Sequence, residues 1–468
     1  MVCLVPKVII TNSTIQISDS NEELKKFLKD TLSYKDKSKE YQIRKMQKNV
    51  FSMNSPLYKQ LVKDSSGTLM EFAGDDILIP SGLAYLLKDM PNIKIEDHRK
   101  DTGKKISLPW ASKTYSLALR PYQEEAVNKA VENWRGIINF ATGLGKTKTA
   151  IALIRRLKSK TLIVCPSKSI ALQFQKELIE AFGVSKVGFI GDGKLKRADL
   201  VVGIAASVSN NVEEIKGWEL GTIIFDETHH TPANTFYAIA SGLSDVGRIY
   251  GLTATAYRSD GKDIFIKASC GDILIQRDAK WGIENGWLAS PYFIVRNVST
   301  IGQDFKDDKL KSYRTHVLKS DLMNERILND ARAFIKDNKF ILILVDQVAH
   351  GDMLAKQLDI PFAQGEDKAS MSYVDQLNAG QILGLVATDG VVGEGVDTRN
   401  VDVLIMANFT ASKGAVMQAV GRGLRKTPKK TSCIILDYCP TGSTQLIRHA
   451  KQRITYYREI TKNVKVVE

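Results

Sequence analysis

Hydrophobic residues in the central and C-terminal parts of the chain form short β-branched runs, each followed by an amphipathic segment. Runs that are apolar on both faces are typical of strands in parallel sheets that helices cover on two sides. The central runs are TLIVCP, DLVVGIA, TIIFDE and RIYGLTAT (residues 161–166, 199–205, 222–227 and 248–255). The C-terminal runs are FIVRNVS, FILILVD, ILGLVATD, VDVLIMAN and TSCIILDY, between residues 293 and 438. This pattern predicts an α/β protein with two consecutive doubly wound parallel sheets.

Residues 1–112 have a different pattern, in which the strand-like runs VPKVII, GTLMEF and DDILIP mix with the lysine-rich helical stretches NEELKKFLKDTL and YKDKSKEYQIRKMQK. This mixture predicts a small α+β domain, and the polar tract 97–110 reads as a linker. The second stretch is either a DNA-binding face or a solvated one; its basic residues are Lys35, Lys37, Lys39, Arg44, Lys45 and Lys48. We therefore expect an N-terminal domain (1–112) and two sheet domains (113–285 and 286–468).

Composition and charge restrict the partners of the protein. The chain has 468 residues, a net charge of +14 and a pI near 9.3, which favours a polyanionic partner, nucleic acid before an acidic membrane. Its five cysteines show no C-x-x-C spacing, so they read as reduced intracellular thiols. No apolar run approaches the roughly 20 residues that span a bilayer. We expect a cytoplasmic protein that does not contact a membrane.

One turn between a predicted strand and a predicted helix carries the pattern of a phosphate-binding loop. Residues 140–147 read FATGLGKT, after the run GIINF and before TKTAIALIRRL. In the pattern G-x-x-x-x-G-K-[ST], backbone N–H groups at a helix N-terminus bind phosphates and the lysine reaches the terminal ones. Phe140 replaces the first glycine, but Gly143 and Gly145 still permit close approach of the backbone. The alternative is an ordinary glycine turn.

An acidic pair follows another apolar run, where Asp226 and Glu227 end the segment TIIFDE, 80 residues after Lys146. Beside a phosphate loop, the aspartate can hold magnesium, usually through water, and the glutamate can polarise an attacking water. A solvated strand end is the alternative. The chemistry predicted is phosphoryl transfer to water.

The phosphate loop and DETH (226–229) occur in order with LTATAYRSDG (252–261) and QAVGRGLRK (418–426). Over about residues 117–440, the chain resembles superfamily 2 helicases and translocases, with these segments as motifs I, II, III and VI. It is most similar to the branch of XPB, phage UvsW-type branch-migration helicases and restriction-enzyme translocases. There the first position of motif I is commonly bulky, as Phe140 is, and motif VI reads Q-x-x-G-R-x-x-R. The resemblance implies two tandem RecA-like domains, although DETH departs from the DEAH spelling at Thr228.

The resemblance also implies an ATP and Mg²⁺ site. Gln123, in LRPYQEEAV, would read adenine, while the default for such a residue is an exposed surface position. The residues implied to bind nucleotide or metal are Gly143, Gly145, Lys146, Thr147, Asp226, Gly395 and Asp397, with Thr147 and Asp226 on the metal. Glu227 would handle water. Arg422 and Arg425 would be arginine fingers, and a structural arginine pair bonded to a carboxylate is the alternative.

Other residues would couple hydrolysis to movement or contact DNA. The coupling residues implied are His229, Thr253, Thr255 and Gln418. The DNA contacts implied are Ser167 and Lys168 in motif Ia, Ser207 in motif Ib, Arg258 after motif III and Thr388 in the motif V segment VATDGVVGEGVD (386–397). Lys168 reads equally well as a solvated lysine.

Together, these residues imply a DNA-stimulated ATPase, a monomeric helicase or translocase on duplex, forked or four-way DNA, with roles in branch migration, recombination and repair. If phage-encoded, it would act in the host cytoplasm. The alternatives are an RNA helicase, which the spelling of motif VI disfavours, and a restriction-type translocase subunit, for which no segment holds an obvious nuclease. A third alternative, from outside the enzymes, is a clamp on nucleic acid that ATP gates without useful hydrolysis.

Overall fold

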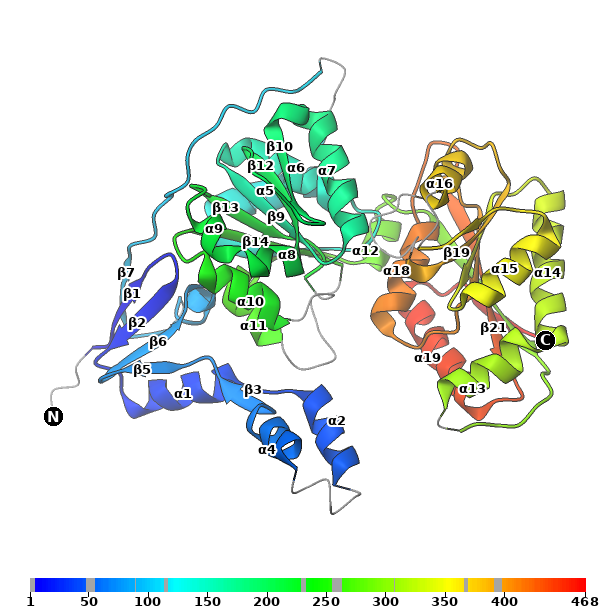
Figure 1. Cartoon of the computed structure of the whole chain (residues 1–468), viewed down its shortest axis with the longest axis horizontal. Coiled ribbons are helices and arrows are strands. Elements are labelled where there is room, and N and C mark those ends of the chain that lie inside the picture. The colour runs from blue at the N-terminus through cyan, green and yellow to red at the C-terminus, as the bar shows by residue number, and fades with distance from the viewer. Residues whose placement is uncertain are drawn as a thin grey trace. The chain divides into compact units, whose positions relative to one another are not determined.

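The computed structural model describes residues 5–47, 55–88, 90–112, 117–228, 233–254, 263–306, 308–365, 369–390 and 398–468. The chain divides into two compact units, the first made of Met1–Phe140 and Gly145–Gln276 and the second of Ala141–Leu144 and Arg277–Glu468. Each unit is built around one of the two predicted sheets (Figure 1). The α/β class with tandem parallel sheets is thus confirmed, and the domain boundaries at 112/113 and 285/286 stay predictions.

The central sheet of the first unit has eight strands in the order β11-β10-β12-β9-β13-β14-β8-β15. Their bounds are β8 Arg135–Phe140, β9 Thr161–Cys165, β10 Val187–Gly191, β11 Lys194–Lys196, β12 Leu200–Ile204, β13 Thr222–Phe225, β14 Arg248–Thr253 and β15 Ile273–Arg277. From β10 to β8 the neighbours pair in parallel, while β11 pairs antiparallel to β10. Every residue of β8, β9 and β13 is buried, as expected for strands covered on both faces.

Helices cover both faces of this sheet (Figure 1). One group of neighbouring helices is α5 Pro121–Glu132, α6 Lys146–Leu157 and α7 Lys168–Phe182. The other includes α8 Ala205–Asn210, α9 Val212–Lys216, α10 Ala233–Gly242 and α11 Asp263–Cys270, and the 3₁₀ turn η2 spans Val184–Lys186. Pro121 begins α5 in the first-turn position that proline tolerates.

The N-terminal part of the first unit contains a five-stranded sheet in the order β5-β6-β2-β1-β7. The strands are β1 Lys7–Ile10, β2 Thr14–Ser18, β5 Glu71–Ala73, β6 Asp76–Pro80 and β7 Lys94–Asp97, and β3 Ser33–Lys35 pairs with β4 Ser66–Thr68. The helices are α1 Glu22–Leu32, α2 Lys37–Met46, α4 Pro56–Lys63 and the 3₁₀ helix η1 Ser81–Leu86. A single hydrophobic core runs from this sheet into the eight-stranded one. A Cβ on Gly82 would lie 2.3 Å from the carbonyl oxygen of Ala268, so only glycine permits this close packing.

Three N-terminal expectations need correction. GTLMEF is two strands, β4 and β5, because buried Leu69 turns inward and its N–H bonds the carbonyl of Leu32. The basic stretch begins in strand β3 and its helix spans Lys37–Met46, while Lys48 lies outside the described residues. The tract 97–110 is irregular but fixed, since the N–H groups of Lys104 and Ile106 bond carbonyls of the eight-stranded domain.

The second unit has a seven-stranded sheet in which all neighbours are parallel, in the order β18-β19-β17-β20-β21-β16-β22. Its strands are β16 Ser290–Val298, β17 Ile341–Val345, β18 Phe362–Ala363, β19 Gly384–Thr388, β20 Val403–Ala407, β21 Ser432–Pro440 and β22 Val464–Val467. Its helices are α12 Ala279–Glu284, α13 Lys309–Tyr313, η3 Arg314–Leu318, α14 Asp321–Lys336, α15 Val348–Leu358, α16 Ser370–Asn378, α18 Lys413–Gly423 and α19 Thr444–Ile460. Figure 1 shows α14 and α15 on one side of this sheet and α18 and α19 on the other.

A buried ion pair joins α19 to β21 in the second unit. The guanidinium of Arg453 donates to both carboxylate oxygens of Asp437 at 2.7 and 2.8 Å, and the Tyr457 hydroxyl donates to the same carboxylate at 2.8 Å. Because both charges are paired and hydrogen-bonded, the interior tolerates them.

Among the described residues, no helix combines the length and apolar character needed to cross a bilayer. Cys165, Cys270, Cys433 and Cys439 are buried free thiols.

Candidate functional site

The candidate site of the first unit lies where its parallel strands end. Strands β8, β9 and β13 end at Phe140, Cys165 and Phe225, and the predicted motifs follow directly. Because neighbouring parallel strands end at the same edge, the phosphate loop and Asp226-Glu227 come together at the carboxyl edge of the sheet. Ligand sites of open α/β sheets form at this edge.

The phosphate loop has the backbone that phosphate binding requires. Gly143 and Gly145 have φ of 89° and 83°, a region that side chains with a Cβ rarely adopt. Gly145 is the N-cap of α6, and a Cβ there would lie 2.4 Å from Nε2 of Gln123. The loop therefore leads into the N-terminus of a 12-residue helix, where backbone N–H groups and the helix dipole bind anions.

Phe140 has a structural explanation. Its ring is fully buried and packs edge-on against Tyr122 of α5, with ring centroids 5.3 Å apart. The aromatic residue thus anchors the end of β8 in the core while the two later glycines supply the tight turn. Replacement of the first pattern glycine therefore leaves the phosphate-binding end of the loop intact.

Lys146 and Glu227 form an ion pair at this edge. The Nζ atom of Lys146 lies 3.0 Å from Oε1 of Glu227, and the two side chains are only 10% and 14% exposed. Glu227 has a left-handed φ of 46°, and its N–H donates to Oδ1 of Asp226 at 3.0 Å. This unusual backbone turns the second carboxylate toward the lysine.

Asp226 is the most perturbed acid of the site. Burial, together with the negative charge of Glu227, raises the pKa of Asp226 to about 7, although Lys146 acts to lower it. A buried carboxylate beside a second one is a costly arrangement that a bound cation would relieve. Mg²⁺ needs only one or two carboxylates when it also binds phosphate oxygens, so Asp226 with the hydroxyl of Thr147 in the first turn of α6 fits this ion.

Gln123 is buried rather than on the surface. Its Oε1 accepts the N–H of Arg120 at 2.9 Å, and its Nε2 lies 3.4 Å from the carbonyl oxygen of Gly145. The side chain is therefore held between the start of α5 and the phosphate loop. Its adenine contact stays a prediction.

Four further predicted residues lie at or just after the ends of strands at the same edge. Ser167 caps α7 and lies 3.0 Å from the hydroxyl of Ser169, and Lys168 pairs with Asp192 at 2.5 Å. Ser207 lies in α8, directly after β12, and buried Thr253 ends β14. Ser167, Lys168 and Ser207 are predicted to contact DNA, and Thr253 is predicted to couple ATP hydrolysis to movement. These roles stay predictions.

Thr228, which replaces the alanine of the DEAH spelling, is buried. It packs closely against Gly251, because a Cβ added to Gly251 would lie only 3.2 Å from Cγ2 of Thr228. The small side chain that the motif needs is thus accommodated.

In the second unit, α18 carries Gln418 and buried Arg422, Arg425 follows the helix, and Thr388 ends β19. Sequence reasoning missed Asp389, directly after Thr388. Burial raises the pKa of Asp389, while a hydrogen bond from Asn408 and the positive charge of Arg422 oppose this shift. The signal for it was the acidic residue that ends ILGLVATD. His229, Thr255, Arg258, Gly395 and Asp397 lie outside the described residues.

These features define the class as a P-loop protein with tandem RecA-like sheets. They are the phosphate loop, buried Asp226 with Glu227 beside it at the carboxyl edge, and a second parallel sheet with arginines at the end of one helix. The family model described as "Type III restriction enzyme, res subunit" matches residues 116–258.

Curated relatives extend this match beyond the first sheet. The putative DNA 3'-5' helicase Rad25 of Halobacterium salinarum is 27% identical over 363 residues, which cover 75% of this chain and 58% of that protein. The ATP-dependent DNA helicase uvsW of Enterobacteria phage T4 is 26% identical over 417 residues, which cover 79% of this chain and 81% of that protein. The chain thus spans a little over half the length of the Rad25 relative.

Among solved structures, a fragment of a putative HsdR subunit of a type I restriction enzyme from Vibrio vulnificus has a similar fold. Its TM-score is 0.55 at 20% identity, with 77% of this chain and 69% of that one covered. These similarities support the assignment of the chain to the superfamily 2 helicases, in the branch that includes XPB and UvsW.

Proposed function

We propose that this protein is an ATP-dependent DNA helicase or translocase that hydrolyses ATP in response to DNA. The observation that carries the proposal is the ion pair between Lys146 and Glu227 beside buried Asp226, at the N-terminus of α6. Support for DNA as the partner comes from the names of the Rad25 and uvsW relatives, which are called DNA helicases, and from the net charge of +14.

Residues of the phosphate loop and of the neighbouring strand ends would divide the work on the nucleotide. The N–H groups at Gly143, Gly145 and the start of α6 bind the phosphates, and Lys146 neutralises the terminal one. Thr147 and Asp226 would hold Mg²⁺, which supplies Lewis acidity at the phosphates. Glu227 accepts the proton of the attacking water. Gln123 would read adenine from its fixed place beside Gly145.

Residues of the second unit would make hydrolysis conditional. Arg422 and Arg425 would place positive charge on the transferred phosphoryl group only when the two units close on DNA, and Gly395 and Asp397 would contact the nucleotide. His229, Thr253, Thr255 and Gln418 would transmit that closure. Ser167, Lys168, Ser207, Arg258 and Thr388 would hold the DNA backbone, as small hydroxyls and cations do.

The finer proposal is that the protein, acting as a monomer inside the cell, moves DNA strands at forks and four-way junctions during recombination and repair. The similarity to uvsW over 79% of this chain supports it. Unwinding assays with duplex, forked and four-way DNA, with a structured RNA as rival substrate and Lys146→Ala as the inactive control, test it. ATP-dependent unwinding of forked or four-way DNA is expected. Unwinding of the RNA alone would refute the proposal, and so would an equal rate for the Lys146→Ala variant.

A further inference from the structure

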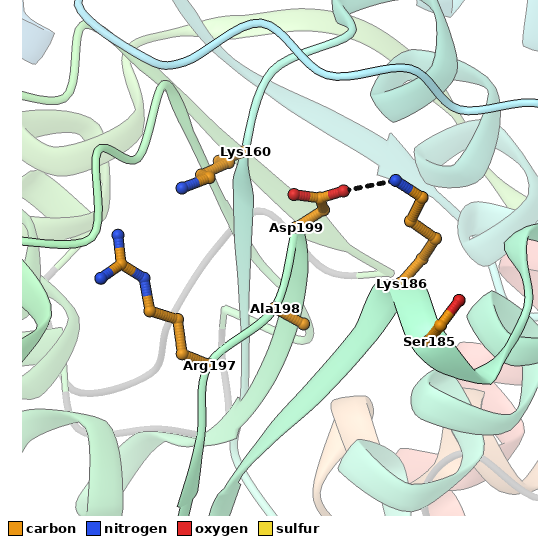
Figure 2. A pocket seen from close by; sticks show the side chains of 6 residues that line it. All are labelled: Lys160, Ser185, Lys186, Arg197, Ala198 and Asp199. Carbon is orange, nitrogen blue, oxygen red and sulfur yellow. Dashed lines mark hydrogen bonds and ion pairs between the residues drawn. The ribbon is translucent and has the colours of Figure 1, made fainter.

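A second charged pocket opens at the opposite edge of the eight-stranded sheet. It has a volume of about 370 Å³ and is lined by Lys160, Ser185, Lys186, Arg197, Ala198 and Asp199 (Figure 2). Lys160 directly precedes β9, Lys186 precedes β10 and Asp199 precedes β12. These three parallel strands are neighbours, so their amino ends bring the side chains together. At about 3.3 Å per residue, the strands separate this edge from the phosphate loop by roughly 16 Å, which makes the pocket a separate site.

The pocket carries more positive than negative charge. Lys186 pairs with Asp199 at 2.7 Å, while Lys160 and Arg197 share Glu219 at 3.0 and 3.5 Å. Three cations therefore meet two carboxylates. The side chain of Lys160 is only 11% exposed, whereas the Glu219 carboxylate that it shares is 53% exposed. A nearly buried ammonium gains little from a shared, solvated partner, so a further anion would stabilise it.

The guanidinium of Arg197 makes two further contacts that restrict its position. It lies over the ring of Trp218, 6.0 Å from its centroid, and its Nη2 is 3.4 Å from the carbonyl oxygen of Gly217. Figure 2 shows Lys160 and Arg197 on one side of Asp199 and Lys186 on the other. The pKa of the Glu219 carboxyl is lowered, mainly by its hydrogen bond from Lys160 and also by the positive charge of exposed Lys104. The backbone N–H of Lys104 donates to the backbone carbonyl of Glu219.

We propose that this pocket binds a phosphate group of a DNA backbone, as a second contact away from the ATP edge; the inference rests on the proposed DNA helicase function. A planar guanidinium matches the oxygens of a phosphate, and two ammonium groups add point charges around it. The pocket is open and exposed Lys104 lies near the Glu219 carboxylate, which suits a continuous polyanion. A phosphate held here would tether a DNA segment to the first unit while the motor residues work at the other edge.

The double variant Lys186→Ala with Arg197→Ala tests the proposal, since these side chains are 33% and 47% exposed and their loss leaves the core intact. The matched control is Lys129→Ala with Lys356→Ala, which removes two exposed lysines from ion pairs of 3.0 and 2.7 Å. Duplex DNA binding is measured by fluorescence anisotropy from 50 to 300 mM KCl, alongside the ATPase rate without DNA and the thermal unfolding midpoint.

We expect the pocket variant to bind DNA several-fold more weakly at low salt. Because one DNA phosphate is no longer neutralised, the slope of log K against log [KCl] should become shallower by about 0.9. The control should keep the wild-type slope, and the basal ATPase should not change. A slope equal to that of the control overturns the proposal. If the pocket variant then also lacks the thermal stabilisation that inorganic phosphate gives the wild type, the pocket binds free anions only, and the proposal of a DNA contact is still overturned. If the wild-type protein binds no DNA at all, the proposed helicase function fails as well.

Discussion

Nζ of Lys146 and Oε1 of Glu227 lie 3.0 Å apart, so the lysine of the phosphate loop and the glutamate after β13 form one ion pair at the carboxyl edge of the first sheet. Each side chain is at least 86% shielded from solvent, which strengthens their interaction relative to a surface pair. The ion pair keeps Lys146, the proposed phosphate-binding cation, next to Glu227, the proposed base that activates water.

Glu227→Gln should separate binding of ATP from its hydrolysis. The amide keeps the size of the side chain but cannot take a proton from water, so we expect the turnover number to fall by about 10²- to 10⁴-fold. Nucleotide affinity should stay within a few-fold of wild type. Single-turnover hydrolysis and equilibrium nucleotide binding measure the two effects, with Glu213→Gln at an exposed position of α9 as the control. Hydrolysis within threefold of wild type would remove Glu227 from the proposed role.

Gly145→Ala should weaken nucleotide binding for a steric reason. The residue has a φ of 83°, and its new Cβ would stand 2.4 Å from Nε2 of Gln123. Gly193→Ala is a matched control, since its φ is 71° and nothing lies within 4 Å of the added Cβ. Both variants carry about 1 kcal/mol of backbone strain, which urea unfolding measures. Only Gly145→Ala should also lower ATP affinity, by tenfold or more; equal affinities for the two variants would contradict this geometry.

The second unit should lose stability in mild acid because of His350. Its ring is fully buried, with Nδ1 2.8 Å from the Tyr313 hydroxyl and Nε2 2.9 Å from Oδ1 of Asn324, and burial lowers its pKa to about 4. The unfolded chain takes up this proton near pH 6.5, while the folded chain does not until about pH 4. Stability therefore falls as the pH drops through this window, by up to about 3 kcal/mol.

Urea unfolding followed between pH 7 and pH 4.5 checks this expectation, with His350→Gln and with His98→Gln at a mostly exposed site as the control. The acid-dependent loss of stability should be smaller in His350→Gln than in wild type. An identical pH slope in the two proteins would show that His350 does not cause the effect.

The strands of both central sheets follow from the sequence because their burial on two faces demands unbroken β-branched runs. TIIFDE, for instance, becomes β13 with the acidic pair directly after it. Strand β10, VGFIG, was missed because its two glycines weaken the strand pattern, and β11, KLK, was missed because it is short and polar at the sheet edge. The nucleotide site was predictable because each motif occupies a few consecutive residues.

Features that depend on strand order were not predictable. Lys160, Lys186 and Asp199 are up to 39 residues apart in the sequence and meet only because β9, β12 and β10 are neighbours. Similarly, the reason for Phe140 in the phosphate loop is its contact with the Tyr122 ring, which the sequence pattern does not reveal. The interruption of GTLMEF at Leu69 and Met70 has the same origin, since both residues turn into the core.

The rate of steady-state ATP hydrolysis tests the proposed DNA-driven motor most directly. It is measured without nucleic acid and then with single-stranded, duplex, forked and four-way DNA and with an RNA duplex. Wild type should hydrolyse ATP at least tenfold faster with at least one DNA, whereas Lys146→Ala should show no activity and Arg422→Ala should lose the stimulation. DNA should also activate more strongly than RNA. A wild-type rate that is the same with and without every nucleic acid would contradict the proposal that this protein is a DNA-driven motor.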